Sequence, residues 1–280
     1  MHWKVKAAIF RLLANAPFGT QAHFALQRHV TKEWPRPAGQ LDKMLAAARR
    51  VHQATDGYPG TFLEIGAGRD LSIAIALRLM GAARVTCVDV ERLARLDLIA
   101  AAAAHMAKRL GVAVPTFDTW DDLERFGLTY RAPAYLEHAG FADASFDGFF
   151  SFDTLEHIPA PDLRVVLSEA KRMLRPGGLC MHAIDYSDHF ARGDSKLSRF
   201  NFLTFSEPAW RKYNSRFQFV NRLRHSQCLA IFREAGFELV RTEPDLVPAQ
   251  RPVLERLAPE FRELEVDDLF TLRAFVVAAA

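Results

Sequence analysis

Apolar residues change their spacing along the chain, and this change predicts the secondary structure. From residue 61 onward, short apolar runs alternate with stretches in which apolar residues recur every three or four positions. The short runs are typical of buried strands, and the longer period is typical of helices that pack on them. The expected strands are 62–65, 85–88, 128–135, 146–152, 179–184, 237–241 and 269–277. The expected helices are 71–80, 93–110, 161–174 and 226–235.

This alternation predicts an α/β fold with a doubly wound, mostly parallel, seven-stranded sheet and helices on both faces. The strand at 128–135 is the weakest, because Pro133 cannot donate to a sheet ladder, so we expect it to be short or displaced. Residues 115–128 look irregular, and 176–178 (Pro-Gly-Gly) predict a tight turn before the fifth strand.

Residues 1–58 show helical spacing without strand-like runs, and one helix is expected over residues 4–15. We therefore divide the chain into an N-terminal helical extension or cap, 1–58, and an α/β domain, 59–280. Within this domain, 186–225 is too long and too aromatic for a simple connection. Loops of that length are usually functional or carry small helices, so we interpret it as an insertion or lid beside the binding site.

The composition restricts the function without naming it. Half of the 280 residues are hydrophobic and the net charge is +3, so no concentrated basic face and no nucleic-acid partner are expected. The three cysteines form no CxxC pair, which is typical of a reduced, cytoplasmic chain. No apolar run reaches the about 20 residues of a membrane helix, so no integral membrane association is expected.

The loop after the first expected strand carries the most informative motif. Ligands of such sheets bind at the carboxyl ends of the strands. Gly66 and Gly68 let the backbone approach a ligand, but Leu71 stands where a dinucleotide-binding loop has its third glycine. Glu64 and Asp70 flank the loop, and two carboxylates suit an ammonium and a sulfonium better than a diphosphate. The alternative is a plain glycine turn, with Asp70 capping the next helix.

A second acidic residue strengthens the first interpretation. Asp89 ends the second expected strand, 21 residues after Gly68, where an acidic side chain holds ribose hydroxyls in nucleotide-binding folds. Asp89 could also be the N-cap of the next helix, and the two roles are compatible.

Five segments, in order, resemble the class I S-adenosylmethionine-dependent methyltransferases of bacteria. They are Leu63-Glu64-Ile65-Gly66-Ala67-Gly68, then Val88-Asp89, then Phe146 to Ser151 with Leu155-Glu156-His157-Ile158-Pro159, then Leu174-Arg175-Pro176-Gly177-Gly178, and finally Glu234-Ala235-Gly236-Phe237. The resemblance implies a Rossmann-like fold, S-adenosylmethionine as the methyl donor and S-adenosylhomocysteine as the product.

The resemblance also assigns cofactor contacts. Glu64 and the loop residues Gly66, Ala67, Gly68 and Asp70 would surround the methionine part. Asp89 would hold the ribose, and Val90 with Tyr135 and Leu136 would lie near the adenine. The pair Tyr135-Leu136 departs from the family, which often has an acidic residue followed by Ala there. Asp153 would line the path from cofactor to acceptor.

Methyl transfer depends mostly on positioning, although an O or N acceptor can also need a general base. His189 is the first candidate and His157 the second, with Asp153 beside them; a structural histidine is the alternative for each. His182, inside an apolar strand, is expected in the core. The expected acceptor-binding residues are Asp185, Tyr186, Asp188, Trp210, Arg222 and Arg224. The two arginines suit a carboxylate or phosphate, but internal ion pairs are the commoner use of such residues.

Four residues could supply oxygen or nitrogen ligands to a metal: Asp153, Asp185, Asp188 and His189. Their spacing along the chain is not diagnostic of a metal site, so no metal is expected. We predict methyl transfer to an O or N atom of a small-molecule or sugar-type acceptor, and a homodimer is one assembly that this prediction allows. The alternatives are a catalytically silent, cofactor-binding partner subunit, an NAD-dependent oxidoreductase, and aminopropyl transfer from the same cofactor.

Overall fold

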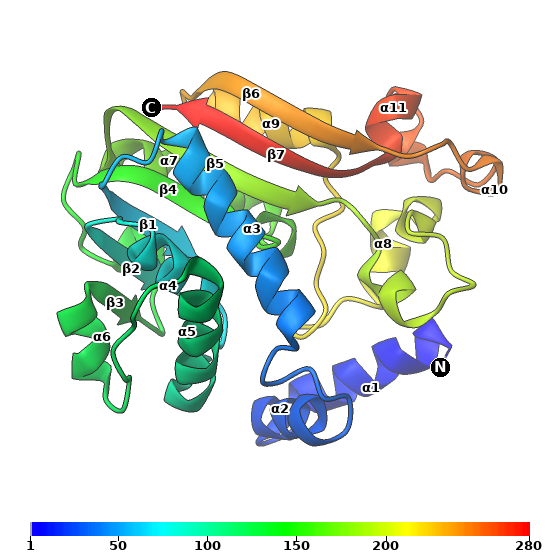
Figure 1. Cartoon of the computed structure of the whole chain (residues 1–280). Coiled ribbons are helices and arrows are strands. Elements are labelled where there is room, and N and C mark those ends of the chain that lie inside the picture. The colour runs from blue at the N-terminus through cyan, green and yellow to red at the C-terminus, as the bar shows by residue number, and fades with distance from the viewer. Residues whose placement is uncertain (1) are drawn as a thin grey trace.

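A computed structural model describes residues 2–280 and contains one seven-stranded sheet. Its strands are β1 (Thr61–Ile65), β2 (Arg84–Val88), β3 (Leu128–Arg131), β4 (Phe146–Phe152), β5 (Leu174–Asp185), β6 (Glu238–Leu246) and β7 (Thr271–Ala279). The order across the sheet is β3-β2-β1-β4-β5-β7-β6 (Figure 1). The first five strands pair in parallel, and β7 runs antiparallel between β5 and β6. The predicted mostly parallel, seven-stranded α/β fold is therefore confirmed.

Helices cover both faces of the sheet because neighbouring strand residues point to opposite sides. Phe62 and Phe150 pack with one core cluster, whereas Leu63 and Phe149 pack with the other. The first face is covered by α3 (Ala38–Ala54), α4 (Ser72–Leu79) and α5 (Leu96–Leu110). The second face is covered by α7 (Ala160–Met173) and α9 (His225–Glu234), as Figure 1 shows.

Three local predictions need correction. Residues 115–128 are not wholly irregular, because they contain α6 (Trp120–Phe126), which begins at a capping box between Thr119 and Asp122. The expected turn at 176–178 lies within β5, where the four residues 175–178 bulge opposite the single residue Asp147 of β4. Asp70 is not the N-cap of α4; Leu71 takes that position in the left-handed region, with φ +48°.

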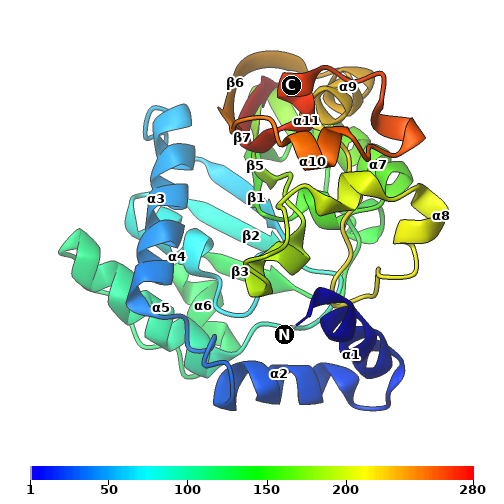
Figure 2. The same ribbon diagram turned by 90° about the vertical axis from the view of Figure 1, so that its right-hand side faces the viewer.

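The N-terminal helices are α1 (Trp3–Asn15), α2 (Gly19–His29) and α3. Leu45, Ala48 and Val51 of α3 share a core with β1 and α4, so residues 1–58 do not pack as a separate unit. By contrast, α1 and α2 lie away from the sheet, at the end of the molecule toward which β1 and β2 run (Figures 1 and 2).

Residues 186–225 and 251–269 form short helices around a third, aromatic core cluster. These helices are η3 (His189–Gly193), η4 (Asn201–Thr204), α8 (Glu207–Trp210), α10 (Arg251–Leu254), η5 (Pro259–Phe261) and α11 (Val266–Leu269). Trp3 of α1 inserts between Phe190, Trp210 and Tyr213, so the N-terminal helix is fixed to the 186–225 segment. None of the helices in residues 2–280 is both long enough and apolar enough to cross a membrane.

Candidate functional site

The glycine loop between β1 and α4 has a backbone that only glycine accommodates easily. Gly66 and Gly68 have φ values of +71° and +74°, in the region that penalises a side chain. A Cβ atom at Gly66 would also lie 2.5 Å from the side chain of Thr154, after β4. Gly66 therefore lets the loop after β1 touch the loop after β4.

Two buried carboxylates stand at this loop. Glu64 is 2% exposed and Asp89, which follows β2, is 8% exposed. Asp89 Oδ2 accepts a hydrogen bond from the Gly68 amide at 3.2 Å. Burial, together with the charge of Asp89, raises the pKa of Glu64 to about 8. Burial also raises the pKa of Asp89 to about 7, against the opposing effect of the Gly68 N–H. A cationic ligand would relieve this pair.

Asp70 has a partner that sequence reasoning missed. Its Oδ2 atom accepts a hydrogen bond from Arg36 Nε at 2.8 Å, and its Oδ1 accepts one from the Ser72 amide at 3.4 Å. Arg36 comes from the connection between α2 and α3, and its guanidinium lies near Gly68. The N-terminal extension thus contributes a cation to the rim of the glycine loop.

The residues expected near an adenine gather beside Asp89. The Ala134 amide donates to the Asp89 carbonyl oxygen at 2.9 Å, which holds Tyr135 and Leu136 next to the end of β2. Tyr135 is 56% exposed and Val90 is 57% exposed, while Leu136 is buried at the start of η1 (Leu136–His138). Two of the three side chains are therefore open to a ligand.

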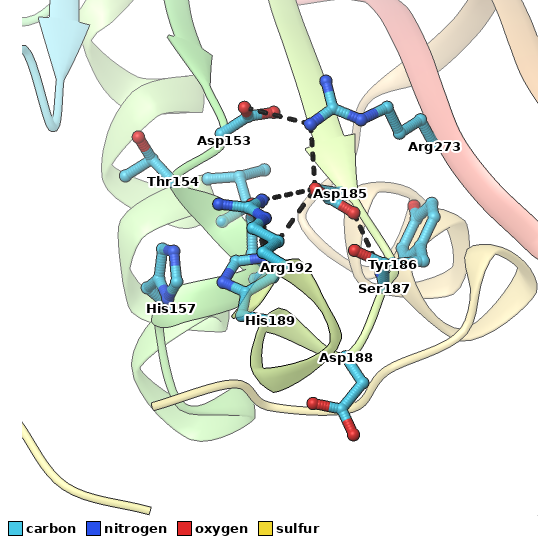
Figure 3. A network of polar contacts seen from close by, with 12 residues as sticks. Asp153, Thr154, His157, Asp185, Tyr186, Ser187, Asp188, His189, Arg192 and Arg273 are labelled. Atoms are coloured by element: carbon cyan, nitrogen blue, oxygen red, sulfur yellow. Dashed lines mark hydrogen bonds and ion pairs between the residues drawn. The ribbon is translucent and has the colours of Figure 1, made fainter. Parts of the chain in front are cut away.

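A second group of polar side chains lies beyond the carboxyl ends of β4 and β5 (Figure 3). Asp153 follows β4, Asp185 ends β5, and His189 begins η3. Arg273 of β7 donates to Asp153 Oδ2 at 3.3 Å and to Asp185 Oδ2 at 2.8 Å. Arg192 donates to the same Asp185 oxygen at 2.5 Å and lies 3.0 Å from His189 Nε2. Side chains from three strand ends are thus joined in one network.

The charges of this network decide its protonation. Burial opposes ionisation of Asp185, but Arg192, the side chain of Ser187 and Arg273 lower its pKa to about 2. Burial and the neighbouring Arg192 lower the pKa of His189 to about 3. At neutral pH, Asp185 is therefore a carboxylate and His189 is a neutral imidazole.

Glu156 is a further functional candidate. From the sequence it was named only as part of a motif and was assigned no role. It lies in η2 (Leu155–His157), is 3% exposed, and neither of its side-chain oxygens has a hydrogen-bond partner among the described residues. Next to it, His157 is exposed and uses Nδ1 for a 2.6 Å hydrogen bond to the Phe219 carbonyl oxygen. The rings of His157 and His189 lie edge to face, with centroids 4.9 Å apart. In the sequence, only its position next to His157 pointed to Glu156. Its burial depends on the fold and could not be predicted from the sequence.

Several expected acceptor-binding residues are directed into the protein. Arg224 donates to the carbonyl oxygens of Tyr186 and Thr271, and Arg222 donates to those of Phe202 and Phe205 and pairs with Glu207. Both guanidinium groups are directed to acceptors inside the protein, although Arg222 Nε has no hydrogen-bond partner among the described residues. We therefore leave both arginines out of the proposed site.

The other inward-facing residues serve the third core and its border. Trp210 is fully buried in the aromatic cluster, and the Tyr186 hydroxyl lies 3.1 Å from His225 Nδ1. Asp188 accepts from Asn201 and the Phe190 amide and points away from the Asp185 network (Figure 3). Among the expected acceptor residues, Asp185 alone joins Asp153, His157 and His189 at the strand ends. His182 lies in the core as expected, 2.7 Å from Ser151 Oγ.

A cavity of about 180 Å³ lies next to this network. Asp153, Arg273 and Arg50 line it, with Glu243 and Asp245 of β6. Charged groups of both signs therefore border the space beside Asp153.

Comparison with known proteins places this geometry in a family. Residues 63–182, from β1 into β5, match the model of a methyltransferase domain. The fold is similar to an S-adenosylmethionine-dependent methyltransferase from Mesorhizobium loti, with a TM-score of 0.50 and 19% identity over 85% of this chain and all (100%) of that one.

It is also similar to the 1,6-didemethyltoxoflavin-N1-methyltransferase of Burkholderia thailandensis, solved with S-adenosylhomocysteine. That likeness has a TM-score of 0.49 and 18% identity, over 100% of this chain and 90% of that one. No curated protein matches the chain in sequence.

The order of the strands and the matched segment support a class I methyltransferase fold that includes residues 63–182. The family model covers less than half of the chain, residues 63–182, and its description is a methyltransferase domain. This match agrees with the methyltransferase resemblance of the sequence and with S-adenosylmethionine as the cofactor that the resemblance implies.

Proposed function

We propose that this protein transfers the methyl group of S-adenosylmethionine to an O or N atom of a small-molecule or sugar-type acceptor. The observation that carries this proposal is the pair of buried carboxylates, Glu64 and Asp89, at a loop whose glycines admit a ligand close to the backbone. Because both pKa values are raised in the free protein, the site favours a ligand that brings positive charge.

The roles follow from where the side chains lie. Glu64 faces the ammonium and sulfonium of the methionine part, and Asp89 accepts hydrogen bonds from the ribose hydroxyls. Val90 and Tyr135 offer exposed apolar surface to the adenine. The loop touches Thr154, so the sulfonium methyl is directed toward the strand ends that carry Asp153, His157 and His189.

The acceptor binds at these strand ends. Its oxygen or nitrogen attacks the methyl carbon, the carbon–sulfur bond breaks with its electron pair staying on sulfur, and S-adenosylhomocysteine leaves. A histidine with a pKa of about 3 is a weak base. His189 is therefore better suited to orient the acceptor than to remove its proton, and orientation supplies much of the rate enhancement.

Calorimetric titration tests the donor half of the proposal. S-adenosylmethionine and S-adenosylhomocysteine should bind to the full chain, whereas NAD should not. Asp89→Asn should weaken the binding of both cofactors about tenfold or more, by loss of a charge-assisted hydrogen bond. Asp162→Asn, at an exposed position in the first turn of α7, is the matched control and should bind normally. Binding of NAD instead would overturn the proposal.

Transfer of a labelled methyl group tests the catalytic half. Extracts or acceptor libraries incubated with the chain and labelled S-adenosylmethionine should yield a labelled small molecule. Cofactor binding without labelling of any acceptor would instead support the silent partner subunit, which shares the donor site but performs no transfer.

A further inference from the structure

Glu156, His157 and His189 form a cluster with the ligand atoms of a metal site. Each residue offers one such atom, and these atoms all lie within 4.8 Å of one another. Glu156 and His157 come from η2 after β4, and His189 comes from η3 after β5. Two adjacent strand ends therefore bring two imidazoles and one carboxylate together.

Glu156 is the residue that points to a bound ion, because neither of its side-chain oxygens has a hydrogen-bond partner among the described residues. A buried carboxylate with no hydrogen bond to either oxygen is costly unless a donor or a cation satisfies it. We propose that Glu156, His157 and His189 bind one divalent metal ion. Two nitrogen ligands and one oxygen ligand favour ions such as Zn²⁺, Mn²⁺, Fe²⁺ or Co²⁺ over Mg²⁺.

The orientation of His157 supports this assignment. Its Nδ1 atom is 2.6 Å from the Phe219 carbonyl oxygen, so the N–H is on Nδ1 and Nε2 keeps its lone pair. Metal-binding histidines usually donate their second ring nitrogen to a carbonyl or carboxylate in this way. The ring of His189 is also directed to the cluster, because its Nε2 atom lies 4.0 Å from Glu156 Oε1.

Arg192 is the cation that now stands closest to the cluster. It lies 3.0 Å from His189 Nε2, but its side chain is 52% exposed and can turn toward solvent. Metal–ligand bonds are about 2.0–2.2 Å long, so ion binding would displace Arg192 and draw the three ligand atoms together. Asp185 Oδ2, at 3.7 Å from His189 Nε2, is held by Arg192 and Arg273 and adds negative charge beside the ion.

The place of the cluster suggests what the ion does, and this part rests on the proposed function. Three protein ligands leave positions open for an acceptor hydroxyl at the strand ends. Coordination lowers the pKa of that hydroxyl, so its proton passes to water before the oxygen attacks the methyl carbon. The acceptor class would then be a hydroxyl compound, with neighbouring oxygens as the best fit, and the reaction would be O-methylation.

Cobalt titration tests the site without any methyl transfer. Co²⁺ added to the tag-free full chain should bind in one equivalent and give visible absorption bands. Glu156→Gln, His157→Ala and His189→Ala should each weaken binding about tenfold or more. His29→Ala, at an exposed position on α2, is the control and should bind like the parent. Binding of S-adenosylhomocysteine shows that each variant is folded.

Two results would overturn the proposal. One is the lack of saturable Co²⁺ binding to a chain that binds S-adenosylhomocysteine; this would leave the methyltransferase proposal intact. The other is equal Co²⁺ affinity in the parent and all three variants. A third outcome separates the two proposals. If Co²⁺ binding depends on the three residues but the chain binds neither S-adenosylmethionine nor S-adenosylhomocysteine, the metal site is supported and the proposed function is rejected.

Discussion

The two halves of the candidate site are built in different ways. The donor half, Glu64 to Gly68 with Asp89, comes from two short loops that follow neighbouring strands, and its contacts are mostly with its own backbone. The acceptor half joins Asp153 and Asp185, at the ends of two strands, to Arg273 of β7, which lies more than 80 residues beyond β5 in the chain.

This difference predicts which substitutions each half of the site tolerates. A loop held by glycine geometry depends on a few positions, whatever happens elsewhere in the chain. A network of remote side chains depends on the whole packing of 186–225 and β7. Substitutions far from the chemistry should therefore disturb the acceptor half first, and substitutions inside the glycine loop should disturb the donor half.

The largest effect is expected at Arg224, which supports the acceptor half from within. Arg224→Met would leave the buried carbonyl oxygens of Tyr186 and Thr271 without donors. Each unsatisfied group costs about 1–3 kcal/mol, so we expect a loss of about 4 kcal/mol in unfolding free energy. Urea denaturation measures this loss, and Arg211→Met, at an exposed position, is the control. A loss below about 1 kcal/mol would contradict the structural role given to Arg224.

The next largest effect is expected at Gly66, where the two halves touch. Gly66→Ala adds left-handed strain of about 1–2 kcal/mol and a clash with Thr154 of about 1–3 kcal/mol. Gly68→Ala should show the strain alone, because the nearest atom to an added Cβ is Arg36 Nη2, at an ordinary contact distance of 3.9 Å. The double variant Gly66→Ala/Thr154→Ala should regain the steric share of both stability and cofactor affinity. Equal losses for Gly66→Ala and Gly68→Ala would show that the contact between the halves is unimportant.

A substitution at His189 should affect turnover and cofactor affinity differently, because His189 belongs to the acceptor half alone. His189→Ala should lower turnover about 100-fold, within the range for positioned groups, while S-adenosylhomocysteine affinity stays within about threefold. Methyl-transfer kinetics and calorimetry measure the two quantities, and His29→Ala should change neither. If cofactor affinity fell as far as turnover, the division into donor and acceptor halves would be wrong.

The smallest effect concerns pH and the donor half. The pKa of Glu64 is raised from 4.5 to about 8, so the folded protein holds a proton that the unfolded chain releases. This stabilising contribution is complete below about pH 4.5 and disappears as the pH rises through about 8. Glu64→Gln should therefore show a smaller fall in Tm between pH 6 and 9 than the parent or the exposed control Glu263→Gln.

The same shifts predict that S-adenosylmethionine binds more tightly at pH 8 than at pH 6. Glu64 must lose its proton to face the cationic groups, and Asp89 must lose its proton to accept from the ribose hydroxyls. S-adenosylhomocysteine, which lacks the sulfonium charge, should show a weaker pH dependence. Titration in buffers of different ionisation enthalpy would count the protons released. Affinity independent of pH for both ligands would contradict the raised pKa values.

Much of the donor half was predictable because its signals are local. The two glycines, the flanking carboxylates and Asp89 at the next strand end are set by spacing along the chain, and the structure places them together as a parallel sheet requires. The helix at Trp120–Phe126 was missed although its capping box was present in the sequence, because the segment lacks a long apolar period.

The acceptor half was predicted less well for a physical reason. Whether Arg222 faces a ligand or the protein depends on which carbonyl oxygens surround it, and the carbonyls of Phe202 and Phe205 reach it only after 186–225 has folded. The Arg36–Asp70 pair likewise joins the N-terminal extension to the glycine loop across 34 residues.

The order of the strands and helices along the chain, the glycine loop and its carboxylates could be predicted from the sequence, because they follow from local periodicity and turn chemistry. The methyl donor was inferred from the resemblance of these motifs to a known family. The tertiary structure alone decided which polar groups were satisfied. It directed Arg222 and Arg224 to carbonyl oxygens inside the protein, and it left Glu156 buried beside two histidines, with no hydrogen-bond partner among residues 2–280. Burial and hydrogen bonding depend on residues distant in the chain, and therefore on the complete fold.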